Sequence, residues 1–159
     1  MQNYVFWITG LSGAGKTTIA LSLRHQLQEL GHTVVLLDGD TLRHILGHHF
    51  GHDPKDRQQL GFIYARLCQE LAQQGLTVIC STISLFHALH QWNRENIPFY
   101  KEIYLTVPLK ERQIRDPKGL YQKAQDGQIT QMAGLHHDIE EPLQPDLIIA
   151  NYGQTTPEM

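Results

Sequence analysis

Apolar residues along the chain are concentrated in five short runs, and the segments between the runs have helical periodicity or turn-forming residues. The runs lie at residues 4–9, 33–37, 76–82, 99–107 and 145–151. Their length and their content of β-branched and aromatic residues predict strands. The run at residues 33–37 is continuously apolar, as expected for a strand that is covered on both faces.

The segments between the runs predict helices, because apolar residues recur in them every three or four positions. We expect helices at residues 16–30, 41–46, 54–74, 84–96 and 108–116. Gly31 and Gly75 are expected to end the first and third of these helices, and Pro54 suits the first turn of the third. Ser84 either caps its helix or contacts a substrate.

A glycine-rich loop, GLSGAGKTT, joins the first expected strand to the first expected helix. It matches G-x-x-x-x-G-K-[ST] in the strand–loop–helix context that this pattern requires, and its glycines let backbone N–H groups converge on an anion. We predict an ATP site, in which Lys16 bridges the β- and γ-phosphates and the Thr17 hydroxyl ligates Mg²⁺. The predicted site comprises Gly10, Leu11, Ser12, Gly13, Ala14, Gly15, Lys16, Thr17 and Thr18.

The alternation of strands and helices predicts an α/β fold with a five-stranded parallel sheet and helices on both faces. A phosphate loop after the first strand indicates a P-loop NTPase of the nucleoside-monophosphate-kinase type, and analogy with that type suggests the strand order 2-3-1-4-5. We treat residues 1–159 as a single P-loop kinase domain. The polar segment at residues 116–145 is expected to be a lid, and the tail at 152–159 is expected to fray.

Two carboxylates, Asp38 and Asp40, follow the second expected strand. Ligands of open parallel sheets bind at this edge, so we expect the pair to face the phosphate site. One would accept the proton of an attacking hydroxyl and the other would hold Mg²⁺-bound water. The alternative is an Asp-Gly turn with two solvated carboxylates.

Basic residues near these carboxylates are candidates for anion binding, because guanidinium groups suit phosphate and sulfate oxygens. Arg43 and Arg57 follow on the next two helices, and taken singly each could equally be a surface arginine. Arg112, Arg115 and Lys118 flank the start of the lid, where they could stack on the nucleotide base or clamp phosphate as the lid closes.

Composition narrows the range of partners and locations. The net charge of −3 gives no general attraction to nucleic acid or acidic membranes, so any anion site must be local. Cys68 and Cys80 are expected to be buried thiols in a reducing cytoplasm, and we see neither a signal peptide nor a membrane-spanning run. The ten histidines include the clusters 48–52 and 136–137, which are expected to be solvated loop residues, with a metal site as the alternative.

Five motifs resemble those of adenylyl-sulfate kinases, in the same order along the chain. They are GLSGAGKTT at residues 10–18, LDGDTLR at 37–43, DR at 56–57, STIS at 81–84 and RDPKGLYQKA at 115–124. The resemblance implies that ATP phosphorylates the ribose 3′-hydroxyl of adenosine 5′-phosphosulfate to give 3′-phosphoadenosine 5′-phosphosulfate. It also implies a small-molecule nucleotide acceptor and a possible homodimer.

The resemblance assigns roles to individual residues. Asp40 would be the base, Lys16 would act on the phosphates, and Asp38 with Thr17 would support the metal. Ser84 matches a serine marked in the family as a phosphoserine intermediate, although direct in-line transfer with Ser84 as a substrate contact is physically simpler. Arg115 and Lys118 would belong to the lid that closes on ATP, and the position of Arg112 beside the lid adds it to the expected ATP contacts. The implied substrate-binding set is Asp40, Arg43, His52, Arg57, Ile83, Ser84, Lys118 and Leu120.

Departures from the family pattern lie on the acceptor side. His52 and Ile139 stand where the family has aromatic residues, and Leu60 and Phe62 replace an asparagine and an arginine. Losing one polar partner can shift selectivity strongly, so the acceptor could instead be cytidine diphosphoramidate, as in a branch of this family. A nucleotide-dependent switch and a kinase for another small metabolite are more distant alternatives.

Overall fold

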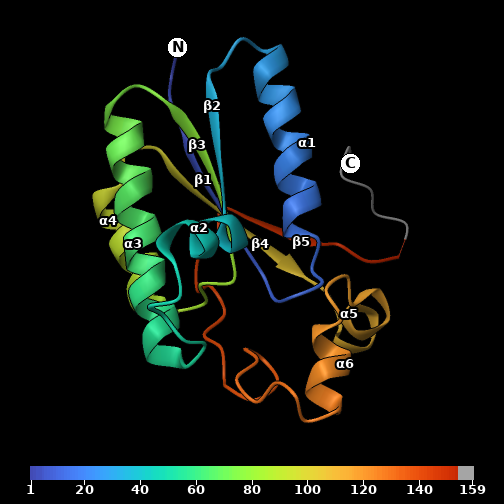
Figure 1. Cartoon of the computed structure of the whole chain (residues 1–159). Coiled ribbons are helices and arrows are strands. Elements are labelled where there is room, and N and C mark those ends of the chain that lie inside the picture. Colours follow the sequence, from blue (N-terminus) through green and yellow to red (C-terminus); the bar gives the residue numbers. More distant parts are fainter. Residues whose placement is uncertain (154–159) are drawn as a thin grey trace.

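A computed structural model describes residues 1–153 of the chain as a five-stranded parallel sheet with helices on both faces (Figure 1). The strand order is β2-β3-β1-β4-β5, so the predicted fold class and strand order are confirmed. Residues 154–159, most of the tail that was expected to fray, lie outside the described residues. The strands are β1 (Val5–Thr9), β2 (Val34–Asp38), β3 (Thr77–Thr82), β4 (Tyr100–Thr106) and β5 (Leu147–Ala150).

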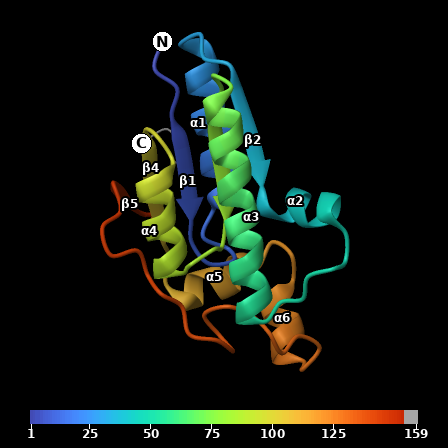
Figure 2. The same cartoon turned by 90° about the vertical axis from the view of Figure 1, so that its left-hand side faces the viewer.

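Helix α1 covers one face of the sheet, and helices α3 and α4 cover the other (Figure 2). Helices α2, α5 and α6 lie near the edge where the strands end. The described helices are α1 (Lys16–Glu29), α2 (Gly39–Leu46), α3 (Pro54–Gln73), α4 (His87–Asn96), α5 (Leu109–Arg115) and α6 (Leu120–Gln125). Within residues 1–153, none of these helices combines the length and the apolar character needed to cross a membrane.

Two helices begin two or more residues away from the expected position, and one helix was not expected, in each case because of side-chain hydrogen bonding. Helix α2 begins two residues early, since the Asp38 carboxylate caps it by accepting from the Asp40 backbone N–H at 3.0 Å. Helix α4 begins three residues late, because the Ser84 hydroxyl lies 2.9 Å from the Thr82 hydroxyl and does not cap the helix. Helix α6 lies inside the expected lid, where the Asp116 carboxylate accepts from two N–H groups of its first turn.

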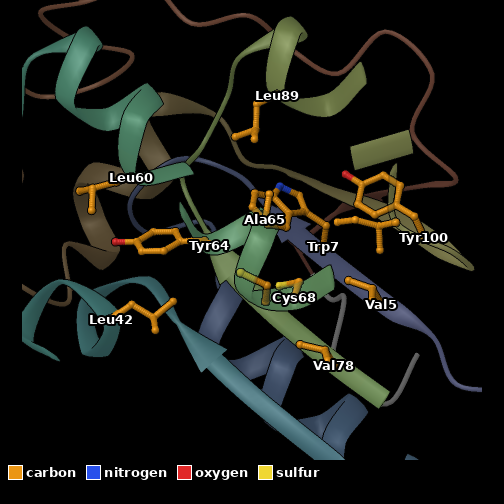
Figure 3. Packing of buried hydrophobic residues seen from close by; sticks show 12 residues of the cluster. Val5, Trp7, Leu42, Leu60, Tyr64, Ala65, Cys68, Val78, Leu89 and Tyr100 are labelled. Atoms are coloured by element: carbon orange, nitrogen blue, oxygen red, sulfur yellow. The ribbon is translucent and has the colours of Figure 1, made fainter. Parts of the chain in front are cut away.

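Two hydrophobic clusters, one on each face of the sheet, form the core. The cluster on the α3/α4 side includes Trp7, Tyr64 and Leu89 (Figure 3), whereas the cluster on the α1 side includes Ile8 and Ile79. Successive residues of β1 alternate between the clusters, as the pleat of a strand requires.

Both cysteines belong to the cluster beneath α3, which confirms the expected buried thiols. Cys68 and Cys80 are free, and burial raises the pKa of the Cys80 thiol well above its usual value. One strand departs from expectation: β2 lies at the edge of the sheet, so its residues are only partly buried rather than covered on both faces. The opposite edge strand, β5, leaves Leu147 and Ile148 half exposed.

The parallel register brings the carboxyl ends of three strands together. Asp38 of β2 is opposite Ser81 of β3, and Thr9 of β1 is opposite Thr82 of β3. Because the phosphate loop follows β1 directly, this register places the loop beside the carboxylates that end β2. The sheet therefore positions the candidate site at the edge where open α/β sheets bind their ligands.

Candidate functional site

A cleft of about 360 Å³ lies at the carboxyl edge of the sheet, between the phosphate loop, α2, α3 and the lid. Its size suits a small-molecule ligand. Sequence-predicted residues from all of these elements line it. They are Ser12, Gly13, Gly15, Lys16, Thr17, Thr18, Asp38, Asp40, Arg43, His52, Arg57, Ile83, Ser84, Lys118 and Leu120.

The phosphate loop has the backbone form that its glycines suggested. Gly13 and Gly15 have φ values of +81° and +91°, a left-handed region that costs other residues free energy. The Ala14 N–H donates to the Leu11 carbonyl at 3.1 Å, which closes a tight turn. The loop therefore presents a curled backbone next to the N-terminus of α1, an arrangement that favours a bound anion.

Lys16 is held at the centre of the site by the loop itself. Its Nζ donates to the Leu11 carbonyl at 3.0 Å. Burial, together with the nearby charge of Lys118, lowers the pKa of Lys16 to about 8, while Asp40 and Asp38 act in the opposite direction. A lysine in this state gains charge when an anion approaches, since phosphate oxygens stabilise the ammonium form.

The side chain of Thr17, in the first turn of α1, lies next to that of Asp38, the last residue of β2. The Thr17 hydroxyl donates to Asp38 Oδ2 at 3.2 Å, and the other carboxylate oxygen caps α2. A hydroxyl and a carboxylate at this spacing are hard oxygen donors of the kind that Mg²⁺ prefers. The residues present therefore fit the predicted magnesium site.

Asp40 is paired with a lysine of the lid. Lys118 Nζ forms an ion pair with Asp40 Oδ2, although the two residues are 78 positions apart in the chain. Both side chains are more than half exposed, so the pair remains accessible to a ligand that enters the cleft. The lid thus reaches the carboxylate that the motifs suggested as the base.

The two acceptor-side arginines lie in the wall of the cleft, and backbone carbonyls accept from some of their N–H groups. Arg43 donates to the Gly51 carbonyl at 3.0 Å, and Arg57 donates to the carbonyls of His52 at 2.7 Å and Gln131 at 3.0 Å. Both residues therefore shape the loop between α2 and α3, and Arg57 also ties that loop to the lid. Sequence reasoning foresaw their location but not these contacts.

His52 and Ser84 differ in burial on the acceptor side of the cleft. His52 is exposed at the rim, where partial desolvation and the neighbouring guanidinium groups of Arg43 and Arg57 lower its pKa. Ser84 is only 7% exposed, and its carbonyl accepts a hydrogen bond from His90 Nε2 at 2.9 Å when that nitrogen carries the proton. A buried serine in the cleft lining suits a contact with the acceptor.

Phe62 does not belong to the acceptor side, contrary to what the family pattern suggested. Its ring packs edge-on against Trp92 of α4 at 6.1 Å between centroids, and the Arg66 guanidinium lies 5.9 Å from it. The cause is helical geometry, since Phe62 lies two residues after Leu60, which does line the cleft.

Arg112 and Arg115 do not line the cleft, and their expected contacts with ATP stay predictions. Arg112 is 7% exposed and donates to the Val107 carbonyl at 3.0 Å and the Tyr121 hydroxyl at 2.7 Å. Arg115 donates to the Gly13 carbonyl at 3.3 Å and the Asn151 carbonyl at 2.7 Å. In the structure both arginines support the phosphate loop.

Three residues of the site were not predicted from the sequence. Tyr64 lines the cleft and lies seven residues after Arg57, on the same face of α3, a spacing that could have revealed it. Asn151 comes directly after the last strand, at the same edge of the sheet as Asp38 at the end of β2, and this position could have revealed it. Its side chain donates to the Ala14 carbonyl at 2.9 Å. Tyr121 lies within the RDPKGLY motif, and its hydroxyl donates to the Ser12 carbonyl at 2.7 Å.

The histidines at 136 and 137 stabilise a turn of the lid. His136 Nδ1 accepts from the Met132 N–H at 2.9 Å, and His137 is hydrogen-bonded to the Gln131 side chain. Among residues 1–153, no three His, Cys, Asp or Glu side chains form a group that could hold a metal ion.

Comparisons with known proteins identify the family of the chain. The family model for adenylylsulphate kinase matches residues 2–150. The chain is 38% identical to a probable adenylyl-sulfate kinase of Archaeoglobus fulgidus over 148 residues, which cover 93% of this chain and 96% of that protein. It is also 38% identical to the cytidine diphosphoramidate kinase of Campylobacter jejuni over 148 residues, which cover 93% of this chain and 86% of that protein.

Among solved structures, the chain is similar to the Mycobacterium tuberculosis APS kinase CysC in complex with AMPPNP and APS. The TM-score is 0.90 at 31% identity, and the match covers 99% of this chain and 92% of that one.

Proposed function

The chain belongs to the adenylylsulphate kinase family, and on that premise we propose that it transfers the γ-phosphoryl group of ATP to the ribose 3′-hydroxyl of a 5′-modified nucleotide. The observation that carries this proposal is the meeting of Lys16, Asp40 and Lys118 in one cleft. The phosphate loop supplies a place for the donor, and the lining formed by α2, α3 and Ser84 supplies a place for the acceptor.

The residues act by positioning and by neutralising charge. The phosphate loop binds the donor phosphates, and Lys16 neutralises the γ-phosphate. Mg²⁺, when bound, would neutralise charge on the β- and γ-phosphates, and Thr17 and Asp38 would hold it. As the bond forms between the 3′-oxygen and the γ-phosphorus, Asp40 takes the hydroxyl proton. The bond from the γ-phosphorus to its bridging oxygen breaks, and ADP leaves with the electron pair.

Lys118 makes two successive contacts in this proposal, first with Asp40 and then with the transferring phosphoryl group. In the structure Lys118 forms an ion pair with Asp40, the residue that we propose as the base. When the acceptor enters between them, the ammonium group is released next to the transferring phosphoryl group. A cation there stabilises the charge that develops on the phosphoryl oxygens.

Adenosine 5′-phosphosulfate is the acceptor that we propose first, because both the Archaeoglobus relative and the ligands named for the Mycobacterium structure concern it. Cytidine diphosphoramidate is the alternative. It is favoured by equal identity to the Campylobacter kinase and by the replacement of family aromatic residues at His52 and Ile139, both of which line the cleft. A smaller pyrimidine base needs less aromatic surface to stack on.

A panel of acceptors tests the proposal. The protein is incubated with ATP and Mg²⁺ plus adenosine 5′-phosphosulfate, cytidine diphosphoramidate or an unmodified nucleotide, and the phosphorylated position is assigned by phosphorus NMR. We expect 3′-phosphorylation of the sulfonucleotide. Turnover with the cytidine compound alone would replace the first acceptor by the second. ATP hydrolysis with no phosphorylated nucleotide would overturn the kinase assignment and favour a switch or a kinase for another metabolite.

Two further properties belong to the proposal. We infer a cytoplasmic location, since two free buried thiols suit a reducing compartment. A homodimer stays a prediction from the family resemblance, and light scattering of the purified protein tests it.

A further inference from the structure

Three successive carbonyl groups of the phosphate loop are each bound by a side chain from a distant part of the chain. The Ser12 carbonyl accepts from the Tyr121 hydroxyl at 2.7 Å, and the Gly13 carbonyl accepts from Arg115 at 3.3 Å. The Ala14 carbonyl accepts from Asn151 Nδ2 at 2.9 Å. These donors come from α6, from the end of α5 and from the residue after β5, so three elements hold the loop.

The carbonyls determine where the loop's N–H groups point. A peptide unit is planar and trans, so a carbonyl held on one side directs the N–H of the following residue to the other side. Tyr121 therefore sets the direction of the Gly13 N–H, and Asn151 sets that of the Gly15 N–H. Both glycines have positive φ, and glycine adopts either sign of φ readily, so these two peptide units could rotate at little cost if they were not held.

The Tyr121 hydroxyl is itself fixed. It accepts a hydrogen bond from Arg112 at 2.7 Å and donates its own proton to the Ser12 carbonyl, and the side chain is 5% exposed. Burial raises the pKa of Tyr121, with the Arg112 guanidinium acting against that shift, so the hydroxyl keeps the proton it donates. Arg112 is held in turn by the Val107 carbonyl at 3.0 Å.

We propose that Tyr121 is a positioning residue for the nucleoside triphosphate, through which the lid helix α6 holds the phosphate loop in its anion-binding form. This inference rests on the proposed binding of ATP at the loop. It has a mechanical consequence, because Lys118 lies three residues before Tyr121 in the same segment. One lid segment therefore contacts both the base Asp40 and the loop that holds the donor phosphates, and docking of α6 and ATP affinity are coupled.

The substitution Tyr121→Phe tests the coupling, since it keeps the ring and removes only the hydroxyl. We expect the dissociation constant of a non-hydrolysable ATP analogue to rise by about five- to tenfold, which corresponds to the net loss of one hydrogen bond. The KM for the acceptor at saturating ATP should stay within about twofold of the wild-type value. Amide hydrogen exchange of the ligand-free phosphate loop should become faster.

Tyr104→Phe is the matched control. Tyr104 is 7% exposed, and its hydroxyl donates to Glu141 in another part of the lid at 2.7 Å, so the control removes an equivalent buried hydroxyl without affecting the loop. Its effect on nucleotide affinity should be less than about twofold.

Two results for Tyr121→Phe would overturn the inference. One is an unchanged dissociation constant for the ATP analogue. The other is a parallel loss of nucleotide affinity, acceptor affinity and melting temperature, which would indicate a general structural role. If the wild-type protein binds no ATP, the inference falls together with the proposed function. If it binds ATP and phosphorylates no nucleotide, only the proposed function falls, and the comparison of the two tyrosine variants still decides the inference.

Discussion

ATP binding should be accompanied by proton uptake at Lys16, and its affinity should fall as the pH rises above about 8. Without bound phosphates, burial of the ammonium group and the nearby charge of Lys118 together lower the pKa of Lys16 to about 8. Bound phosphates favour the charged form, so they raise this pKa again. A group whose pKa rises on binding strengthens binding below its ligand-free pKa and weakens it progressively above.

The size of the effect follows from the pKa of about 8. At that pH, half of the ligand-free molecules carry a neutral Lys16, so binding should take up about half a proton per ATP. One pH unit higher, the neutral fraction is about nine tenths, and the apparent dissociation constant should be about tenfold above its limit at low pH. One pH unit below this pKa, the apparent dissociation constant should exceed its limit at low pH by only about a tenth.

Titration calorimetry in two buffers of different ionisation enthalpy measures the proton uptake directly. Lys16→Arg should abolish it, because a guanidinium stays charged throughout this range. Lys118→Gln removes a neighbouring positive charge and should move the loss of affinity to higher pH, whereas Asp40→Asn should move it to lower pH. Equal binding heats in both buffers, or a shift of the two variants in the same direction, would refute the reasoning.

Three other predictions concern the base, the acceptor side and the lid. Asp40→Asn should lower kcat by about 10²- to 10⁴-fold at saturating ATP, with the ATP affinity at low pH preserved, and near-normal single-turnover rates would exclude Asp40 as the base. Arg57→Lys cannot bridge the two carbonyls that Arg57 binds, so kcat/KM for the acceptor should fall by about 10- to 100-fold while ATP affinity stays constant. Gly134→Ala would place a methyl group 2.7 Å from a terminal methyl group of Leu11, and it should lower the free energy of unfolding by about 1 kcal/mol more than Gly127→Ala, which has a similar φ and open space. Equal urea midpoints for the two glycine variants would show that the lid does not pack on the phosphate loop.

Much of the fold could be predicted because its signals are local. The glycine loop, the apolar runs and the stop signals each depend on neighbouring residues, and they predicted the strands, whereas the order of the strands came from analogy with the nucleoside-monophosphate-kinase type of sheet. Asp38 and Asp40 could be placed as well, since residues that follow a parallel strand come to the same edge of the sheet. The helix boundaries at Ser84 and in the lid were missed because side-chain hydrogen bonds determined them.

The orientation of the basic residues could not be predicted in this way. Five basic residues were candidates for binding a ligand, namely Arg43, Arg57, Arg112, Arg115 and Lys118. In the structure, Arg112 and Arg115 support the phosphate loop, and Arg57 joins the acceptor-side loop to the lid. A long cationic side chain can bind a carbonyl as readily as a phosphate, and only the surrounding chain determines which one lies within reach.

The sequence by itself determined the chemistry at the donor side. A phosphate loop is built from consecutive residues, so the motif contains both the glycines that allow its backbone conformation and the lysine that carries its charge. Tertiary structure alone decided how that loop is held. The Tyr121 hydroxyl and the Ser12 carbonyl are 109 positions apart, and Asn151 and Ala14 are 137 positions apart. Contacts of this kind depend on how the sheet and the lid bring distant segments together, so they leave no pattern in any one stretch of the chain.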